Sequence, residues 1–398
     1  MCSRKFLQGL VRVIDHVHWS FSLVLLSALR ALEKSPARIA DINTVIVIRN
    51  CFFGDFVVAV PALQKLRKAF PCAQIVFLTA ASFADGWKTR AQESSIFQIE
   101  SGLIDRVVPY TIENLRTGDS RSGLRTQLKI SGSMVTVSLC YSGASLLSRI
   151  KHIALCHMLK LPLPLGLTSV HTLPAQQWLN RWRIGRLDIV HQCDAATASV
   201  DEALKRLGLS SPPLLPMASH RRLAVNRCLL VGVAPFTKQS VKQWPLKRFA
   251  EVMRLLDESL NVCFEIYGAP EELYLADQLY SMLGDSINKK MLCGVLTPIQ
   301  LRQHIEKVDV LLCLDSGPAH VASLVGTPVV AIFSQITLHN FWRPWGSQGS
   351  LISVEVPCAK CDTRNGECPI GTKACITGIE VSVVVASLRA ALHSETSR

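Results

Sequence analysis

The hexapeptide Asp-Ser-Gly-Pro-Ala-His, residues 315–320, places a carboxylate, a hydroxyl and an imidazole directly after the apolar run VLLCL. The apolar run is typical of a buried strand, and the small residues after the hexapeptide predict a helix. A helix that begins here presents free backbone N–H groups, which bind anions such as phosphate. In a second interpretation, Asp315 or Ser316 only caps the helix, with Pro318 in its first turn. Both interpretations remain open from the sequence alone.

Two more predicted strands end in polar residues that could bind a nucleotide. After VGVAPF the chain carries Lys238 and Lys242, and Trp244-Pro245 then predicts the start of a helix. A lysine there can reach a phosphate, although most surface lysines have no specific role. After EIYG, Glu271 and Glu272 fall in a first helical turn, where acidic residues normally complement the helix dipole. A glutamate in this position could also accept hydrogen bonds from ribose hydroxyls.

A fourth candidate lies near the start of the chain, in the stretch RNCFFGDFVV. Gly54 allows a tight turn, and Asp55 stands at the beginning of a predicted helix. Asp55 either caps that helix or, if it faces a cleft, acts as a general base on an acceptor hydroxyl.

The elements that must position these residues alternate between strand and helix. Residues 43–49, NTVIVIR, predict a buried parallel strand, and ALQKLRKAF and AQIVFLTA complete a βαβ unit. The proline-rich segment 210–216 is the best linker candidate, and a second α/β series follows it. We therefore predict an α/β protein of two Rossmann-like domains, residues 43–215 and 216–398. Ligands are expected in the interdomain cleft, at the carboxyl ends of the strands.

Composition narrows the classes of protein that fit. The 398 residues exceed the size of a typical single core, and 49% apolar with 18% charged residues excludes a disordered chain. The formal net charge of +13 favours an anionic partner, such as a phosphorylated substrate, an acidic membrane surface or nucleic acid. The basic residues are spread widely, without an RNA-binding signature or a basic stripe, so we predict no nucleic acid partner.

Residues 1–42 form an extension with a basic start and an apolar tract. Asp15 and His16 interrupt the tract and no clear cleavage site follows, which argues against a signal peptide. The uncharged stretch from Val17 to Leu29 is too short for a membrane span. It either lies on an anionic inner leaflet or packs on the protein. We expect a cytoplasmic protein with reduced cysteines. If the stretch lies on the leaflet, the protein is attached peripherally to the cytoplasmic face of the inner membrane.

The segment 358–375 is rich in cysteine. Its spacing, C-x2-C-x6-C-x6-C, could supply four thiolates to zinc or to an iron–sulfur cluster, from Cys358, Cys361, Cys368 and Cys375. It lacks the paired C-x2-C knuckles of the strongest zinc motifs. Two interpretations therefore remain open: the segment binds a metal, or it is a loop whose cysteines are reduced or occasionally disulfide-linked.

Five motifs, taken in order, resemble one known family. VIVIRNCFFGDFVVAVPAL, KQWPLKRFAEVMRLL, YGAPEE, DSGPAHVASLVGTPVVAIFSQ and FWRPWG together are similar to the bacterial ADP-heptose:lipopolysaccharide heptosyltransferases, glycosyltransferase family 9. The resemblance extends from about Asn43 to Leu388. It implies a GT-B fold, with the acceptor in the N-terminal domain and the nucleotide-sugar in the C-terminal domain. It also implies an inverting transfer that needs no metal or other cofactor, with ADP-heptose as donor and a lipid-anchored lipopolysaccharide core or related surface glycan as acceptor.

The resemblance also implies roles for individual residues. Asp55, after Gly54, matches the catalytic base, Lys242 matches the lysine on the donor diphosphate, and Glu272 matches the carboxylate near the ribose. The loop under the phosphates is matched by Asp315, Ser316, Gly317 and His320.

The acceptor side departs from the family pattern. Ser133 and the stretch LPLPLGL stand where family members often carry an acidic residue and an arginine before a glycine. The acceptor pocket is therefore expected to differ or to be impaired. A catalytically silent nucleotide-sugar-binding scaffold, or an enzyme with a different donor sugar, remains an alternative, and the oligomeric state is not predicted.

Overall fold

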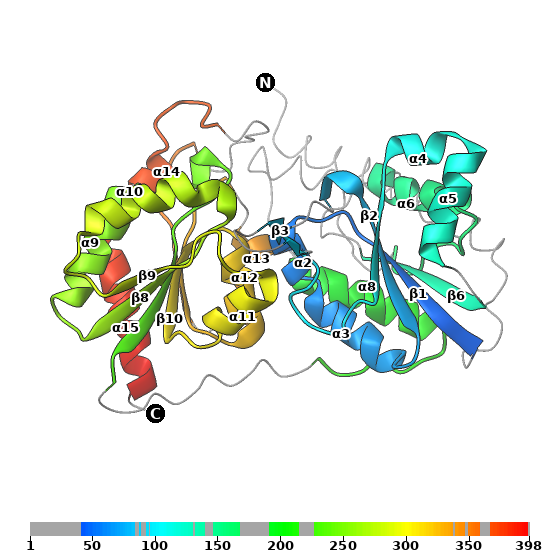
Figure 1. Cartoon of the computed structure of the whole chain (residues 1–398), viewed down its shortest axis with the longest axis horizontal. Helices are drawn as coiled ribbons and strands as arrows, with labels where there is room; N and C mark the ends of the chain where they lie inside the picture. Colours follow the sequence, from blue (N-terminus) through cyan, green and yellow to red (C-terminus); the bar gives the residue numbers. More distant parts are fainter. Residues whose placement is uncertain are drawn as a thin grey trace, which may run out of the picture. The chain divides into compact units, whose positions relative to one another are not determined.

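The computed structural model describes residues 41–83, 87–88, 93–94, 96–129, 132–139, 146–167, 191–214, 227–336, 339–346, 349–358 and 367–396. The predicted apolar and basic extension up to residue 40, and Cys361, lie outside these residues. The described chain forms two compact units (Figure 1). The first takes residues from 41–52, 59–83 and 101–214. The second takes residues from 53–58, 87–100 and 227–396, so two short segments that sequence order assigned to the first domain belong to the second unit.

The first unit is built on a parallel sheet in the order β5-β2-β1-β6. Its strands are β1 (Ile42–Ile48), β2 (Gln74–Ala80), β5 (Arg106–Tyr110) and β6 (Ser133–Ser138). Its helices are α3 (Val60–Ala69), α4 (Ile112–Arg116), α5 (Gly118–Leu128), α6 (Leu146–Met158) and α8 (Gln192–Arg206). The central strand β1 is apolar on both faces, because helices cover both sides of a parallel sheet. The strands predicted from the apolar runs are confirmed.

The second unit has a six-stranded parallel sheet in the order β12-β11-β10-β7-β8-β9. The strands are β7 (Leu229–Ala234), β8 (Val262–Ile266), β9 (Lys289–Met291), β10 (Val310–Leu314), β11 (Val329–Ile332) and β12 (Gly349–Ile352). The strand order reverses between β7 and β10, which pair directly. In open parallel sheets, ligands bind at such a topological switch point, beyond the carboxyl ends of the strands.

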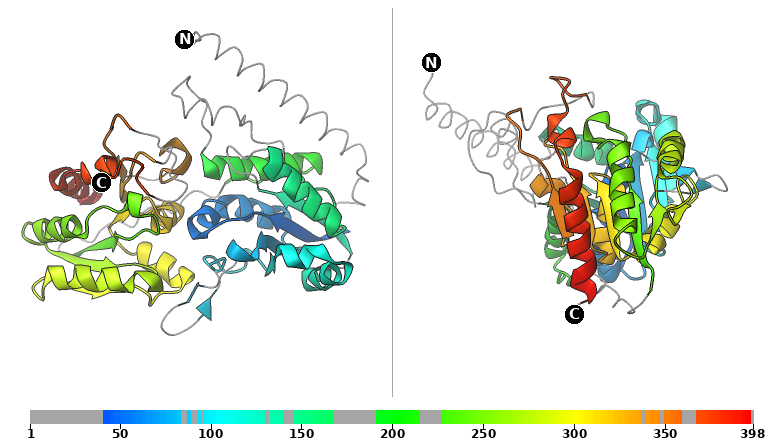
Figure 2. Two further views of the ribbon diagram at one scale, coloured as in Figure 1. Left: turned by 90° about the horizontal axis from the view of Figure 1, so that it is seen from above. Right: turned by 90° about the vertical axis from the view of Figure 1, so that its left-hand side faces the viewer.

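Helices cover both faces of this second sheet. They are α9 (Leu246–Asp257), α10 (Leu273–Leu283), α11 (Pro298–Ile305), α12 (Gly317–Val325), α13 (His339–Trp342), α14 (Ala374–Thr377) and α15 (Val381–Thr396), with 3-10 turns η3 (Ser240–Lys242) and η4 (Pro270–Glu272). Figure 1 shows α9 and α15 over one face of the sheet and α11 and α12 over the other. The red helix α15 runs along the sheet in the right-hand view of Figure 2. Two shorter pieces complete the second unit: helix α2 (Phe53–Val57) and a ribbon of β3 (Trp87–Lys88) and β4 (Glu93–Ser94).

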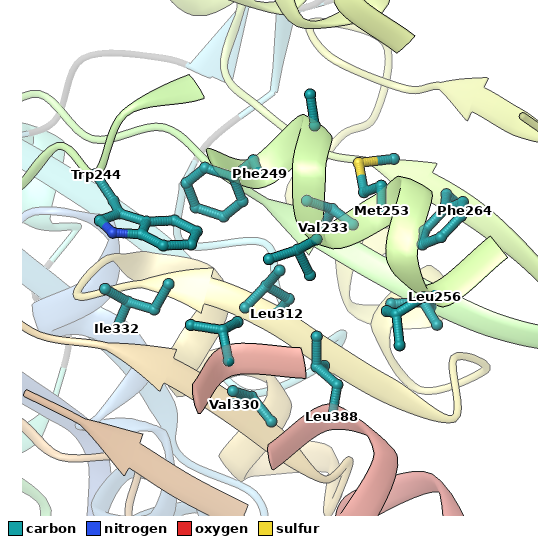
Figure 3. Close-up of a cluster of buried hydrophobic side chains, with 14 of the residues drawn as sticks. Val233, Trp244, Phe249, Met253, Leu256, Phe264, Leu312, Val330, Ile332 and Leu388 are labelled. Atoms are coloured by element: carbon teal, nitrogen blue, oxygen red, sulfur yellow. The ribbon is translucent and has the colours of Figure 1, made fainter. Parts of the chain in front are cut away.

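The core of the second unit lies between the sheet and the α9 and α15 side (Figure 3). Leu312 and Ile332 from the strands meet Phe249 from α9 and Leu388 from α15, and all four are fully buried. Each such side chain contributes about 1.5–3 kcal/mol by leaving water. This packing holds the strand ends of the second unit in place.

The expectation of reduced cysteines is wrong for one pair, because Cys228 and Cys263 form a disulfide. Cys228 directly precedes β7 and Cys263 lies on the neighbouring strand β8, which brings their Cα atoms to 6.2 Å. The sequence did not reveal this pair, because pairing depends on which strands are neighbours in the sheet. The other cysteines of the described residues, among them Cys358, Cys368 and Cys375, are free thiols. Among the helices of the described ranges, none has the length and apolar character to cross a membrane.

Candidate functional site

The strand ends at the switch point carry an ion pair. Lys242 Nζ lies 2.7 Å from Asp315 Oδ2. Lys242 belongs to η3, in the loop after β7, and Asp315 follows β10 directly. The Asp315 side chain is 6% exposed and that of Lys242 is 16% exposed. Two residues that the sequence analysis assigned to phosphate binding are therefore adjacent, and a partly buried cation stands where ligands bind in this type of sheet.

The Lys-Gln-Trp-Pro motif explains how Lys242 is held. Trp244 is fully buried, and its indole N–H donates to the Ile379 carbonyl at 3.2 Å. The Gln243 side-chain amide donates to the Pro235 carbonyl at 2.7 Å, which ties the two ends of the loop after β7 together. A lysine on a fixed loop loses less side-chain entropy when it binds an anion than a lysine on a mobile one.

Helix α12 begins at Gly317, directly after this ion pair. Ser316 occupies the N-cap position, but its hydroxyl donates to the Leu314 carbonyl at 3.3 Å and does not cap the helix. The capping interpretation is therefore wrong for Ser316. The positive end of the α12 dipole lies next to Lys242, and together they favour a negatively charged group.

His320 follows on the first turns of α12. It is 5% exposed, and its ring centroid lies 6.0 Å from that of Trp342 on α13. The histidine of the predicted phosphate loop and the tryptophan of the FWRPWG motif are therefore neighbours.

Glu272 lies at the end of η4, after β8, and is also held in place. Its Oε2 accepts a hydrogen bond from the Ala269 backbone N–H at 2.7 Å. Burial raises the pKa of the Glu272 carboxyl, while the Ala269 N–H and the charge of Lys238 oppose the rise. A Cβ on Gly268 would come within 2.6 Å of the Cys293 sulfur, so only glycine fits in this turn. Glu272 therefore stabilises the turn after β8, and its role at a ribose stays a prediction.

Gly54 and Asp55 belong to α2, which packs on α12 within the second unit. A Cβ on Gly54 would lie 3.4 Å from Gly317 Cα and 3.4 Å from His320 Cδ2. The half-buried Asp55 is the next residue along α2. The structure thus brings the predicted base onto the helix that packs against the predicted phosphate loop.

The cysteine-rich loop is described only in part, since Cys361 lies outside the described ranges. Within the ranges that are described, no three His, Cys, Asp or Glu side chains are grouped so as to hold a metal ion. Cys368 accepts a hydrogen bond from the Lys373 N–H at 3.4 Å. This bond and further backbone N–H groups lower the pKa of the Cys368 thiol. The four-thiolate site stays a prediction.

A polar cluster at the strand ends of the first unit was not predicted from the sequence. His152 Nδ1 on α6 lies 2.6 Å from the Ser138 hydroxyl at the end of β6. Burial, and then the charge of Arg49 at the end of β1, lower the pKa of His152 to about 4. The Arg49 side chain is fully buried. The sequence held a signal for part of this cluster. Arg49 and Ser138 both stand at the carboxyl ends of buried strands, and the ends of parallel strands meet at one edge of a sheet.

One model of a protein family matches a stretch that runs from α8 of the first unit through most of the second unit. Residues 192–370 match glycosyltransferase family 9 (heptosyltransferase). This part of the chain is similar to family 9. It contains Lys242, Glu272 and the Asp315–His320 loop, so the resemblance drawn from the motifs is confirmed.

Curated proteins similar to this chain are named as heptosyltransferases. The chain is 28% identical over 166 residues to the lipopolysaccharide core heptosyltransferase OpsX of Haemophilus influenzae, which covers 39% of this chain and 46% of that relative. It is 28% identical over 153 residues to lipooligosaccharide heptosyltransferase 2 of Campylobacter jejuni, covering 38% of this chain and 47% of that relative. The matches thus span about half the length of these relatives.

Solved family 9 structures have the same fold. A glycosyl transferase family 9 protein from Veillonella parvula superposes with a TM-score of 0.62 at 16% identity, covering 90% of this chain and all of that one. The Escherichia coli ADP-heptose lipopolysaccharide heptosyltransferase II superposes with a TM-score of 0.60 at 16% identity, covering 89% of this chain and 99% of that one. The predicted GT-B fold class is confirmed.

Proposed function

We propose that the protein is an inverting, metal-independent glycosyltransferase that transfers a heptose from ADP-heptose to a lipopolysaccharide core or related surface-glycan acceptor. The observation that carries this proposal is the Lys242–Asp315 ion pair at the switch point, beside the start of α12 and inside the stretch that matches family 9. The relatives named above act on lipopolysaccharide or lipooligosaccharide by name. The heptosyltransferase WaaC of Escherichia coli, similar in fold with a TM-score of 0.55, was solved with ADP-2-deoxy-2-fluoro heptose.

The reaction follows from the chemistry of these side chains. The Asp55 carboxylate accepts the proton of the acceptor hydroxyl, whose oxygen forms a bond to the anomeric carbon of the donor sugar. The bond from that carbon to the diphosphate oxygen breaks, and the configuration inverts. The departing diphosphate carries the negative charge away. Lys242 and the N–H groups at the start of α12 stabilise this charge, and electrostatic stabilisation of this kind is often the largest contribution to catalysis.

Location and partners are part of the same proposal. We place the enzyme in the cytoplasm, peripherally on the inner membrane, where the lipid-anchored acceptor presents phosphate groups to a chain of net charge +13. Glu272 is proposed to bind the donor ribose, since only one of its carboxylate oxygens is assigned to the Ala269 N–H.

Nucleotide binding tests the donor site. We expect ADP, titrated calorimetrically, to bind more tightly than UDP or GDP. Lys242→Met should weaken ADP binding about 10- to 100-fold, the range for a lost charge-assisted hydrogen bond. Lys247→Met is the matched control, because Lys247 is an exposed lysine on the nearby helix α9 and should leave ADP affinity unchanged. A folded protein that binds none of the three nucleotides would refute the proposal.

Transfer itself separates an enzyme from a silent scaffold. With ADP-heptose and a heptose-deficient lipopolysaccharide acceptor, Asp55→Asn should lower kcat about 10²- to 10⁴-fold. ADP affinity should stay unchanged in this variant. If the wild type binds ADP but transfers no sugar to any core acceptor, the scaffold alternative replaces the enzyme.

A further inference from the structure

The N-terminal residues of α2 and α12 meet at two glycines. A Cβ on Gly317 would lie 2.5 Å from Phe53 Cδ1, closer than real Cβ contacts come, and 3.0 Å from Phe53 Cε1. The Phe53 ring therefore lies directly against the glycine backbone at the start of α12. Gly54 approaches the same backbone from α2, with 3.4 Å between its ideal Cβ position and Gly317 Cα. Any side chain at position 317 would displace the Phe53 ring.

A second aromatic contact also holds α2. Phe56 is fully buried, and its ring packs edge-on against Phe97 with 4.8 Å between the centroids. Phe53, Phe56 and Phe97 all belong to the second unit. Helix α2 has only five residues, too few to be stable by itself, so its position depends on these contacts. Asp55 lies between the two aromatic residues in the sequence.

We propose that Phe53 is a positioning residue for the transfer reaction. Its ring, seated on Gly317, sets the distance between the Asp55 carboxylate and the start of α12. This inference rests on the proposed function, in which Asp55 is the base and α12 holds the donor diphosphate. It also gives a reason for glycine at position 317, because the missing side chain makes room for the Phe53 ring.

The expected loss of kcat on removing the Phe53 ring follows from the sensitivity of catalysis to geometry. A misplacement of about 1 Å in a reacting group can lower the rate about 10²-fold. Phe53 does not have to touch the donor for this effect, so loss of its ring should lower kcat and leave donor affinity unchanged. A residue that only stabilised the fold would not separate these two quantities.

The test uses the full-length protein and compares kcat, KM for ADP-heptose and the Kd for ADP. We expect Phe53→Ala to lower kcat about 10- to 100-fold with Kd for ADP within about 2-fold of wild type. Phe53→Leu should restore much of the rate, because a leucine still fills space against Gly317. Phe52→Ala is the matched control, because Phe52 is 58% exposed and its ring packs at a tilt against Phe83, with 4.7 Å between the centroids. Its kcat should not change.

The variant Gly317→Ala tests the same contact from its other partner. Its backbone has no left-handed φ, so the new methyl group meets the Phe53 ring and no backbone restriction. We expect kcat to fall as in Phe53→Ala, and the double variant to be no slower than Gly317→Ala alone, because the two changes disturb one contact. Circular dichroism checks that each variant folds, and Gly317→Ala serves if Phe53→Ala does not fold.

The outcomes distinguish this inference from the proposed function. An active wild type in which Phe53→Ala keeps full kcat, or loses ADP affinity in proportion to kcat, overturns the positioning role alone. A wild type that binds ADP without transferring sugar overturns the proposed function, and the positioning role falls with it.

Discussion

The half-buried His152 of the first unit makes the stability of the protein depend on pH in a predictable direction. His152 lies 2.6 Å from the Ser138 hydroxyl, and burial together with the Arg49 charge lowers its pKa from 6.5 to about 4. Above about pH 6.5 the ring is neutral in both the folded and the unfolded chain. Between these two values the unfolded chain takes up a proton that the folded chain does not. Acidification from pH 6.5 towards 4 therefore favours unfolding.

The size of this effect follows from the two pKa values. One pKa unit corresponds to about 1.4 kcal/mol, so the fall to about 4 corresponds to about 3 kcal/mol for a completely buried ring. The His152 side chain keeps some contact with solvent, which screens the Arg49 charge. We therefore expect a loss of about 2 kcal/mol in the free energy of unfolding between pH 7 and pH 4.5 from this residue.

Urea denaturation followed by circular dichroism measures the loss. Wild type, His152→Gln and His157→Gln are compared at both pH values. His157 is an exposed histidine on the same helix and provides the matched control. Wild type and His157→Gln should lose about 2 kcal/mol more on acidification than His152→Gln. An equal loss in all three proteins would show that His152 is already protonated in the folded state, and would refute the reasoning.

Three further predictions concern the residues that hold the site in place. Trp244→Ala should lower the free energy of unfolding by about 3–5 kcal/mol, and Trp244→Phe by about 1–2 kcal/mol through the lost hydrogen bond to Ile379, both measured by urea denaturation. Lys65→Met should lower the free energy of unfolding by about 1 kcal/mol, because the buried Lys65 ammonium lies 2.6 Å from an Asp201 carboxylate that is 44% exposed. Thermal unfolding measures this loss, and an unchanged melting temperature would contradict it. The raised pKa of Glu272 should make ADP affinity fall on acidification at a higher pH than for an ordinary glutamate, and calorimetry should find affinity independent of pH in this range for Glu272→Gln.

Much of the architecture was predictable from local patterns. The strand β1 and its neighbour β2 are apolar runs bounded by polar residues, and such runs form buried parallel strands wherever helices cover both faces of the sheet. The motif order was equally informative, because each motif falls at the end of a strand. The position of Glu272 after β8 and of Asp315 after β10 follows from this rule.

Contacts between distant segments were not predictable. Lys242 and Asp315 were each expected at a phosphate, but their ion pair depends on β7 and β10 being neighbours in the sheet. The disulfide between Cys228 and Cys263 depends in the same way on the pairing of β7 with β8. Strand order is set by how the whole sheet buries its apolar surface, and no local pattern records it.

The sequence by itself determined the fold class, the resemblance to glycosyltransferase family 9 and the residue types at each strand end, because hydrophobic periodicity and turn chemistry are local properties. Only the tertiary structure decided that α2 joins the second unit and that the Phe53 ring rests on Gly317. A glycine in a sequence shows where a side chain is missing. The folded chain shows which neighbour occupies the space, since that neighbour comes from a distant part of the chain.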